Sequence, residues 1–153
     1  FSNPKVEVLY DDGARFVAET ENEYDIIIVD SSDPIGPAEV LFQKPFHQNI
    51  HDRLAHDGIL ISQTESPFYN QDTIRKVFKN LKTIFPVAEL YTAYIPTYPS
   101  GLWSFAFCSK KYSPLKDLDR RYVSDLKLET KYYNPDLHEA AFKLPNFVRQ
   151  LVE

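Results

Sequence analysis

The stretch that decides the fold is YDIIIVDSSDPIGPAE, residues 24–39. Its first half contains the continuous β-branched run Ile26–Val29, which is typical of a parallel strand covered on both faces of a sheet. Its second half contains two prolines and a glycine within residues 30–37, which forces a loop. We therefore expect a buried strand that ends in a polar loop. In open α/β sheets ligands bind beyond the carboxyl ends of strands, so this loop is the first candidate for a site.

The segments on either side of this stretch predict an alternation of strands and helices. Upstream, residues 5–10 alternate charged and apolar side chains and favour a strand, and residues 14–19 favour a short helix capped by Asp12. Downstream, Phe46, Ile50 and Leu54 recur every four residues and predict a helix over 45–56, which Gly58 would end.

The remaining elements complete an α/β pattern. We expect a buried strand over 59–63, a helix from Asn70 to Phe85, and strands over 87–95 and 103–109 joined as an antiparallel hairpin. Short helices are expected over 115–122, 135–142 and 145–152. The order predicts an α/β fold with a mostly parallel, Rossmann-like sheet and a C-terminal antiparallel hairpin.

Composition excludes several classes of protein. The 153 residues, 43% of them hydrophobic, suffice for one globular domain, and no apolar run approaches the roughly 20 residues of a membrane span. The net charge of −5 and the lack of a basic tract argue against nucleic acid as the main partner. The single cysteine, Cys108, excludes an internal disulfide and fits a reducing, cytoplasmic location; we expect it to be a core residue.

Two counts in the composition are unusual. There is no methionine, so we expect the sequence to begin inside a longer protein. The four glycines are too scattered to form a Gly-rich phosphate loop of either the dinucleotide or the NTPase type.

Several residues could carry chemistry. Asp30 and Asp33 lie three apart after the buried strand, where carboxylates can do acid/base work or hold a cation, although Asp is also common in turns. Tyr98 stands in the rigid loop PTYPSG, which would project it, but packing is an equal alternative. His47 and His51 have the i, i+4 spacing of a zinc pair, yet position 48 is not the Glu a metalloprotease needs, so we expect no metal site.

Four motifs in order resemble those of the spermidine synthases. DSSDPIGPAE over 30–39 and IPTYPSG over 95–101 are similar to the two signatures of that family. Asp12-Gly13-Ala14 and Gln63 followed by Glu65 also stand at matching places. The resemblance is specific to about Lys111. It implies a class I methyltransferase-type fold and transfer of an aminopropyl group from decarboxylated S-adenosylmethionine to putrescine, without metal or other cofactor, giving spermidine and methylthioadenosine.

The resemblance also implies roles for individual residues. Asp30 would be the catalytic base. The acceptor amine would be positioned by Asp33, Gln63 and Tyr98 with the backbone of Ser31 and Ser32, and the donor would be bound by Asp12, Gly13, Pro37, Ala38 and Leu41.

The resemblance implies an incomplete sheet in this chain. Residues 1–111 would be the later part of the catalytic domain and 112–153 its helical extension, with residues 5–10 as the third strand of the order 3-2-1-4-5-7-6. The missing N-terminal portion would hold most of the donor site, so we expect the chain alone to be nearly inactive, and we expect a homo-oligomer for the whole protein. Alternatives are another amine acceptor (agmatine, cadaverine or spermidine), a small-molecule methyltransferase, and a non-catalytic regulatory subunit.

Overall fold

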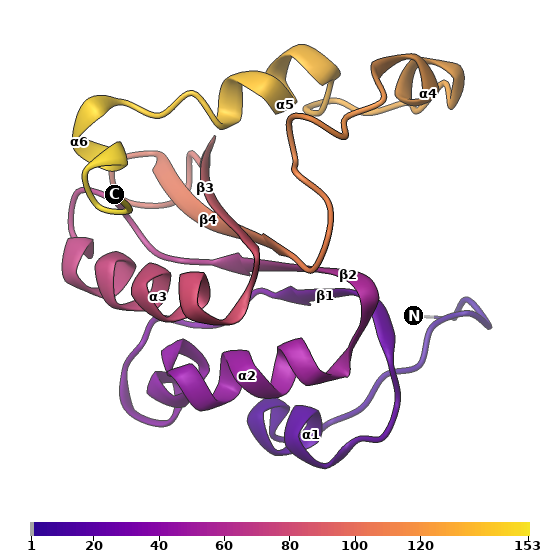
Figure 1. Ribbon diagram of the computed structural model, residues 1–153, viewed down its shortest axis with the longest axis vertical. Helices are drawn as coiled ribbons and strands as arrows, with labels where there is room; N and C mark the ends of the chain where they lie inside the picture. Colours follow the sequence, from indigo (N-terminus) through magenta and orange to yellow (C-terminus); the bar gives the residue numbers. More distant parts are fainter. Residues whose placement is uncertain (1) are drawn as a thin grey trace.

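A four-stranded mixed sheet in the order β1–β2–β4–β3 forms the centre of the computed structural model, which describes residues 2–153 (Figure 1). β1 (Tyr24–Val29) pairs in parallel with β2 (Leu54–Gln63), and β4 (Leu102–Ser109) runs antiparallel to both β2 and β3 (Val87–Tyr94). The predicted α/β fold with a C-terminal hairpin is confirmed, and this order matches the 4-5-7-6 end of the expected sheet. The parallel part of the described sheet is the single pair β1–β2.

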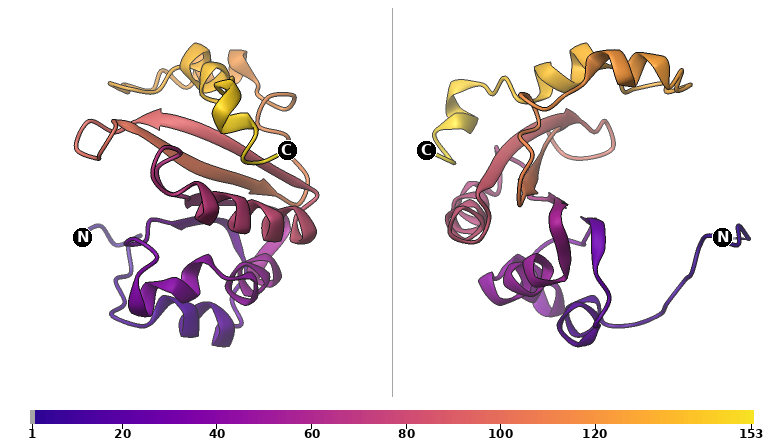
Figure 2. Two further views of the ribbon diagram at one scale, coloured as in Figure 1. Left: turned by 90° about the vertical axis from the view of Figure 1, so that its left-hand side faces the viewer. Right: turned by 45° about the vertical axis from the view of Figure 1, so that its right-hand side comes forward.

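Four helical segments lie on one face of the sheet (Figures 1 and 2). They are α1 (Gly13–Glu19), the 3₁₀ helix η1 (Gly36–Phe42), α2 (Lys44–Arg53) and α3 (Gln71–Ile84). The predicted apolar stripe of α3 is buried, and it packs with side chains of α2 and of the sheet in one core. Each fully buried aliphatic or aromatic side chain of that core contributes about 1.5–3 kcal/mol. Cys108 is fully buried in this core, as predicted, and its burial raises the pKa of the thiol.

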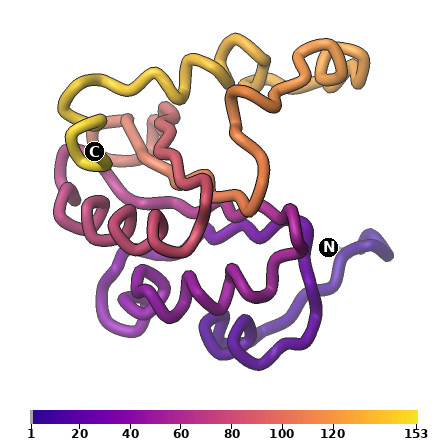
Figure 3. The backbone as a smooth tube through the Cα atoms, viewed as in Figure 1, coloured from indigo at the N-terminus to yellow at the C-terminus, as the bar shows by residue number. Residues whose placement is uncertain are grey.

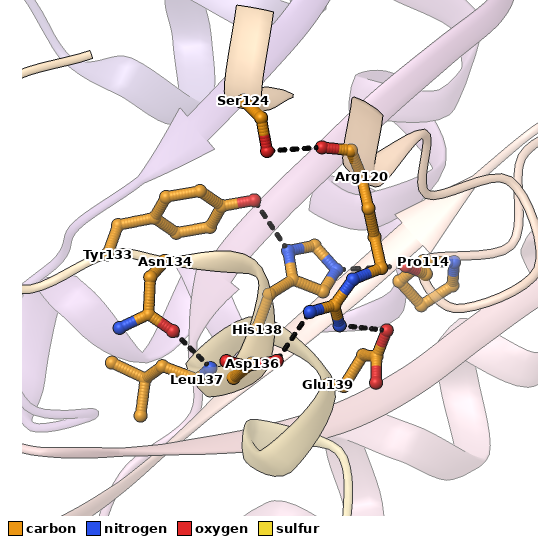
Figure 4. Close-up of polar contacts among 9 residues, drawn as sticks. All are labelled: Pro114, Arg120, Ser124, Tyr133, Asn134, Asp136, Leu137, His138 and Glu139. Carbon is orange, nitrogen blue, oxygen red and sulfur yellow. Dashed lines mark hydrogen bonds and ion pairs between the residues drawn. The ribbon is translucent and has the colours of Figure 1, made fainter. Parts of the chain in front are cut away.

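The C-terminal segment crosses the other face of the sheet before its end returns to the core. It contains α4 (Arg120–Asp125), α5 (Pro135–Ala141) and α6 (Asn146–Arg149). Figure 4 shows how α5 is fastened: Arg120 pairs with Asp136 and Glu139, and His138 donates from Nε2 to the Pro114 carbonyl at 2.9 Å. Val148 and Leu151 join the same buried cluster as α3. The division of the chain into a catalytic part, residues 1–111, and a helical extension, residues 112–153, stays a prediction.

The prediction of a strand over residues 5–10 is wrong. This segment has no regular secondary structure and runs away from the helices, as the tube in Figure 3 shows. Val8, Leu9 and Tyr10 are exposed. A strand needs a neighbour for its backbone hydrogen bonds, and the described part of the chain provides none for this segment.

Two predicted helix boundaries are also wrong. The helix expected to continue to His56 ends at Arg53, because Leu54 pairs with Tyr24 of β1; Ile26 then pairs with Ile59, so residues 55–58 bulge between the two pairs. The helix expected over 115–122 is α4, which begins after Asp119 because that side chain accepts a capping hydrogen bond from the Tyr122 N–H at 2.8 Å.

β1 is an edge strand in the described chain, which differs from the expectation that both of its faces are covered. Ile27 and Val29 pack against the core, whereas Ile26 and Ile28 are 58% and 70% exposed. Apolar side chains on an unpaired edge are a site for further strand pairing or covering. Within residues 2–153 we find no helix of the length and apolarity that a membrane crossing requires.

His47 should make the stability of the fold depend on pH. It is buried on α2, its Nδ1 has no partner among the described residues, and burial lowers the pKa of the imidazole to about 4. As the pH falls, the unfolded chain takes up this proton near pH 6.5, whereas the folded chain takes it up only near pH 4. The free energy of unfolding therefore decreases by up to about 3 kcal/mol as the pH is lowered from 6.5 to 4.

Chemical denaturation at pH 7 and at pH 4.5 measures this change in the free energy of unfolding. His47→Leu is expected to remove its contribution to the pH dependence, whereas the same substitution at the exposed His56 should not. An unchanged pH dependence in His47→Leu would show that His47 is not the titrating group.

Candidate functional site

An open cavity of about 920 Å³ lies at the carboxyl ends of β1 and β2. Its walls come from three loops: the one after β1, the one after β2, and the loop of the β3–β4 hairpin. It brings together six of the residues that the sequence singled out: Asp30, Ser31, Ser32, Asp33, Gln63 and Tyr98. The size falls within the range of small-molecule sites.

The loop after β2 is held as a continuation of the sheet. Thr64 donates its N–H to the Ser104 carbonyl at 2.9 Å, and the two hydroxyl groups of these residues lie 2.8 Å apart. Ser104 in turn donates to the Glu65 carbonyl from its N–H at 3.1 Å and from its hydroxyl at 2.7 Å. Gln63 and Glu65, which this loop positions, are buried residues that line the cavity.

The hairpin loop is closed by its own backbone. Ile95 donates to the Gly101 carbonyl at 2.7 Å, and Gly101 donates to the Tyr98 carbonyl at 3.0 Å. Gly101 has φ of +68°, a left-handed conformation that glycine adopts without a steric penalty. The loop carries Tyr98 into the cavity wall, where its ring packs against Trp103 at 4.6 Å between centroids, while 45% of its surface stays exposed. Projection and packing, which the sequence left as alternatives, therefore occur together.

The cavity is acidic. Asp30, Asp33 and Glu65 line it, and among its lining residues in the described chain there is no Lys, Arg or His. Burial raises the pKa of Glu65, the negative charge of Asp33 raises it further, and the hydrogen bond from Gln63 acts in the opposite direction. Burial also raises the pKa of Tyr91 to about 12, so its phenol is neutral in the cavity wall. Such a site favours a cationic ligand.

The sequence did not single out two residues that shape this cavity. Glu65 was noted only as part of a motif, and Trp103 only as part of a strand. A Gln and a Glu two residues apart at the end of a buried strand are a visible signal that could have drawn attention to Glu65. The bond from Trp103 to Gln63 has no local signal, because the two residues are 40 positions apart.

A second, more apolar cavity of about 390 Å³ lies on the other side of the β1 end. Gly13 and Leu41 line it, together with Asp30 and Ser31, which also line the larger cavity. Asp12, Pro37 and Ala38 are not among its lining residues. Asp12 caps α1, as predicted: its Oδ1 accepts from the N–H groups of residues 14 and 15 at 2.9 and 3.2 Å.

The histidine pair on α2 does not form a common site. His47 is buried beside Phe46, whereas the ring of His51 packs edge-on against Phe85 and its Nδ1 lies 3.2 Å from Asp52. Within residues 2–153, no group of three or more His, Cys, Asp or Glu side chains could hold a metal ion.

Residues 1–120 match the family model of the spermine/spermidine synthase domain. The chain belongs to the spermine/spermidine synthase family. It is 52% identical over 149 residues to a polyamine aminopropyltransferase of Caldicellulosiruptor saccharolyticus, covering 97% of this chain and 52% of that protein. It is 50% identical over 153 residues to another of Alkaliphilus oremlandii, covering 99% and 54%.

Solved structures of the family share this fold. A spermidine synthase in complex with the transition-state analogue AdoDATO superposes with a TM-score of 0.94 at 39% identity, over 99% of this chain and 52% of that one. The spermidine synthase from Thermotoga maritima gives 0.91 at 38% identity, over 99% and 51%. The chain thus spans about half the length of the relatives it matches.

The hairpin loop that carries Tyr98 should depend on Gly101. An alanine there would keep the left-handed backbone at a cost of about 1–2 kcal/mol, and its Cβ would lie 2.6 Å from Cε2 of Tyr94. We expect Gly101→Ala to lower the free energy of unfolding by at least this amount, measured by urea denaturation.

Gly13→Ala is the matched control. A Cβ at Gly13 meets no atom within 4 Å among the described residues, and the position begins a helix. Its stability should stay within about 1 kcal/mol of the unmodified protein. Equal effects of the two substitutions would argue against a conformational requirement at Gly101.

Proposed function

We propose that this chain is the catalytic part of a polyamine aminopropyltransferase that moves the aminopropyl group of decarboxylated S-adenosylmethionine to putrescine. Family membership supports the reaction class. The observation that carries the proposal is the position of Asp30, which lines both the acidic cavity and the apolar one. A transfer between two substrates needs a proton acceptor where their sites meet.

In the proposed reaction Asp30 takes a proton from the attacking amine. The freed lone pair attacks the carbon next to the sulfonium sulfur, and the carbon–sulfur bond breaks with its electrons left on sulfur. The products are spermidine and the neutral thioether methylthioadenosine. Because the leaving group is already activated, the protein has to hold nitrogen, carbon and sulfur in line and to accept one proton.

The apolar cavity suits the donor's nucleoside. Leu41 and Gly13 would contact the adenine, with Pro37 and Ala38 of η1 beside them. Oδ1 of Asp12 is used by the helix cap, which leaves Oδ2 to accept from the exocyclic amine of adenine. Donor contacts beyond these would come from the other half of a longer protein, which would also cover Ile26 and Ile28 of β1.

The acidic cavity suits the acceptor. Asp33, Gln63 and Tyr98, with the backbone of Ser31 and Ser32, would surround a diamine that carries positive charge. Putrescine is the proposed acceptor, and assays of the full-length protein with agmatine, cadaverine and spermidine test that choice. Incubation with S-adenosylmethionine and with its decarboxylated form separates the proposal from a methyltransferase.

We propose in addition that the whole protein is a homo-oligomer and that it works in the cytoplasm. Light scattering of the full-length protein tests the oligomer.

Asp30→Asn tests the base in a full-length protein that carries this segment. The amide keeps the size of the side chain but cannot take the proton, so we expect kcat to fall about 10²–10⁴-fold, measured as release of methylthioadenosine. Asp25→Asn, on an exposed β1 position, is the control and should leave turnover unchanged. A loss of less than tenfold in Asp30→Asn would remove Asp30 from the role of base.

Tyr98→Phe tests the hairpin loop. The ring can still pack on Trp103, but the hydroxyl is lost, so we expect the KM for putrescine to rise about 5- to 10-fold, the worth of one hydrogen bond. The KM for decarboxylated S-adenosylmethionine should stay within twofold of the unmodified protein. A selective loss of donor binding would show that the loop faces the donor.

A further inference from the structure

Gln63 has no acceptor left for an amine. Its Oε1 accepts from the Trp103 indole N–H at 2.9 Å and from the Glu65 N–H at 3.2 Å. Because the indole can only donate, this contact fixes which end of the amide is oxygen. The Nε2 donates to Glu65 Oε1 at 3.0 Å and to Ser31, whose carbonyl and hydroxyl oxygens lie at 3.2 and 3.3 Å. An ammonium group only donates, so it needs an acceptor other than this amide.

Glu65 supplies such an acceptor. It lines the cavity although the residue is only 1% exposed, and just one of its carboxylate oxygens, Oε1, accepts a hydrogen bond from the described residues. The second oxygen, Oε2, accepts none. Oε2 is not among the fully buried side-chain atoms that lack a partner, so it keeps some accessible surface in a residue that lines the cavity. A cationic donor in the cavity would give it a charge-assisted hydrogen bond.

The backbone of Glu65 has an unfavourable conformation that the surrounding hydrogen bonds maintain. Its φ is +81°, in the left-handed region that non-glycine residues rarely adopt. The conformation is maintained by the two bonds from Ser104 to its carbonyl and by the bond from its N–H to Gln63. Strain of this kind persists where the surrounding structure enforces it, and it is concentrated at functional sites.

We propose that Glu65 directly accepts a hydrogen bond from an ammonium group of the acceptor amine, and that Gln63 and Trp103 are positioning residues that act through it. The inference rests on the proposed function and deepens it, since it moves direct contact with the amine from Gln63 to Glu65. Asp33 lines the same cavity, and its charge adds to the attraction for the cation. The rings of Tyr98 and Trp103 offer faces that a cation also favours.

Glu65→Gln in a full-length protein that carries this segment is the direct test. The substitution keeps an oxygen for the bond from Gln63 Nε2 and removes only the charge. Titration calorimetry with putrescine, in the presence of methylthioadenosine, is expected to show affinity reduced about 10- to 100-fold, the range for a hydrogen bond to a charged group. The KM for decarboxylated S-adenosylmethionine and the Tm should stay unchanged.

Glu89→Gln is the matched control. It removes one partly buried carboxylate from β3 that does not line the cavity, so the net charge of the two variants is equal. Putrescine affinity in Glu89→Gln should stay within twofold of the unmodified protein. Equal weakening by the two substitutions would indicate a general charge effect and overturn the inference.

A double-mutant cycle tests the positioning role. Trp103→Phe keeps the ring and removes the N–H that orients Gln63, so it should weaken putrescine binding about 3- to 10-fold by itself. In the Glu65→Gln background it should add less than twofold, because the group it positions has lost its charge. Full additivity would overturn the indirect role.

Binding and turnover separate the two proposals. Unchanged putrescine affinity in Glu65→Gln, or no putrescine binding by the unmodified protein, would overturn the role of Glu65. Failure of the unmodified full-length protein to release methylthioadenosine with any diamine would instead overturn the proposed function, while the effect of Glu65→Gln on binding would stand.

Discussion

The central position of β2 is the constraint on which the site depends. β2 pairs in parallel with β1 and antiparallel with β4, and the two registers place Ser62 opposite both Val29 and Ala106. The next residues along each strand are therefore brought together: Asp30 after β1 and Gln63 at the end of β2. A shift of one residue in either register would turn Gln63 to the other face of the sheet and away from the cavity.

Local patterns in the sequence were sufficient for most of the fold. The β-branched run of β1, the apolar stripe of α3 and the Pro- and Gly-rich hairpin loop each specify an element without help from distant residues. Elements that depend on tertiary partners were predicted less well. Leu54 fits a helix stripe and a strand equally, and its pairing with Tyr24 decides between them. Residues 5–10 have a strand pattern but no partner among the described residues.

The residues of the candidate site also fall into those that local sequence predicts and those that depend on distant residues. Asp30, Asp33 and Tyr98 were found because they stand in loops that local chemistry defines. Glu65 was not, because its left-handed backbone results from bonds to Ser104, which is 39 positions away. A sequence motif can show that Gln63 and Glu65 belong together. It cannot show that Trp103 donates to the amide oxygen of Gln63, or that only one carboxylate oxygen of Glu65 accepts a hydrogen bond from the described residues.

The acidity of the cavity has a further consequence in the proposed reaction. Both substrates are cations, a sulfonium and an ammonium, and they must approach to bonding distance against their mutual repulsion. Asp30, Asp33 and Glu65 surround that approach with negative charge in a partly desolvated site, where charge interactions are stronger than in water. After transfer the sulfur is neutral and Asp30 holds a proton, so the attraction for the spent donor falls when its charge disappears. The same carboxylates would thus favour binding before the reaction and release of methylthioadenosine after it.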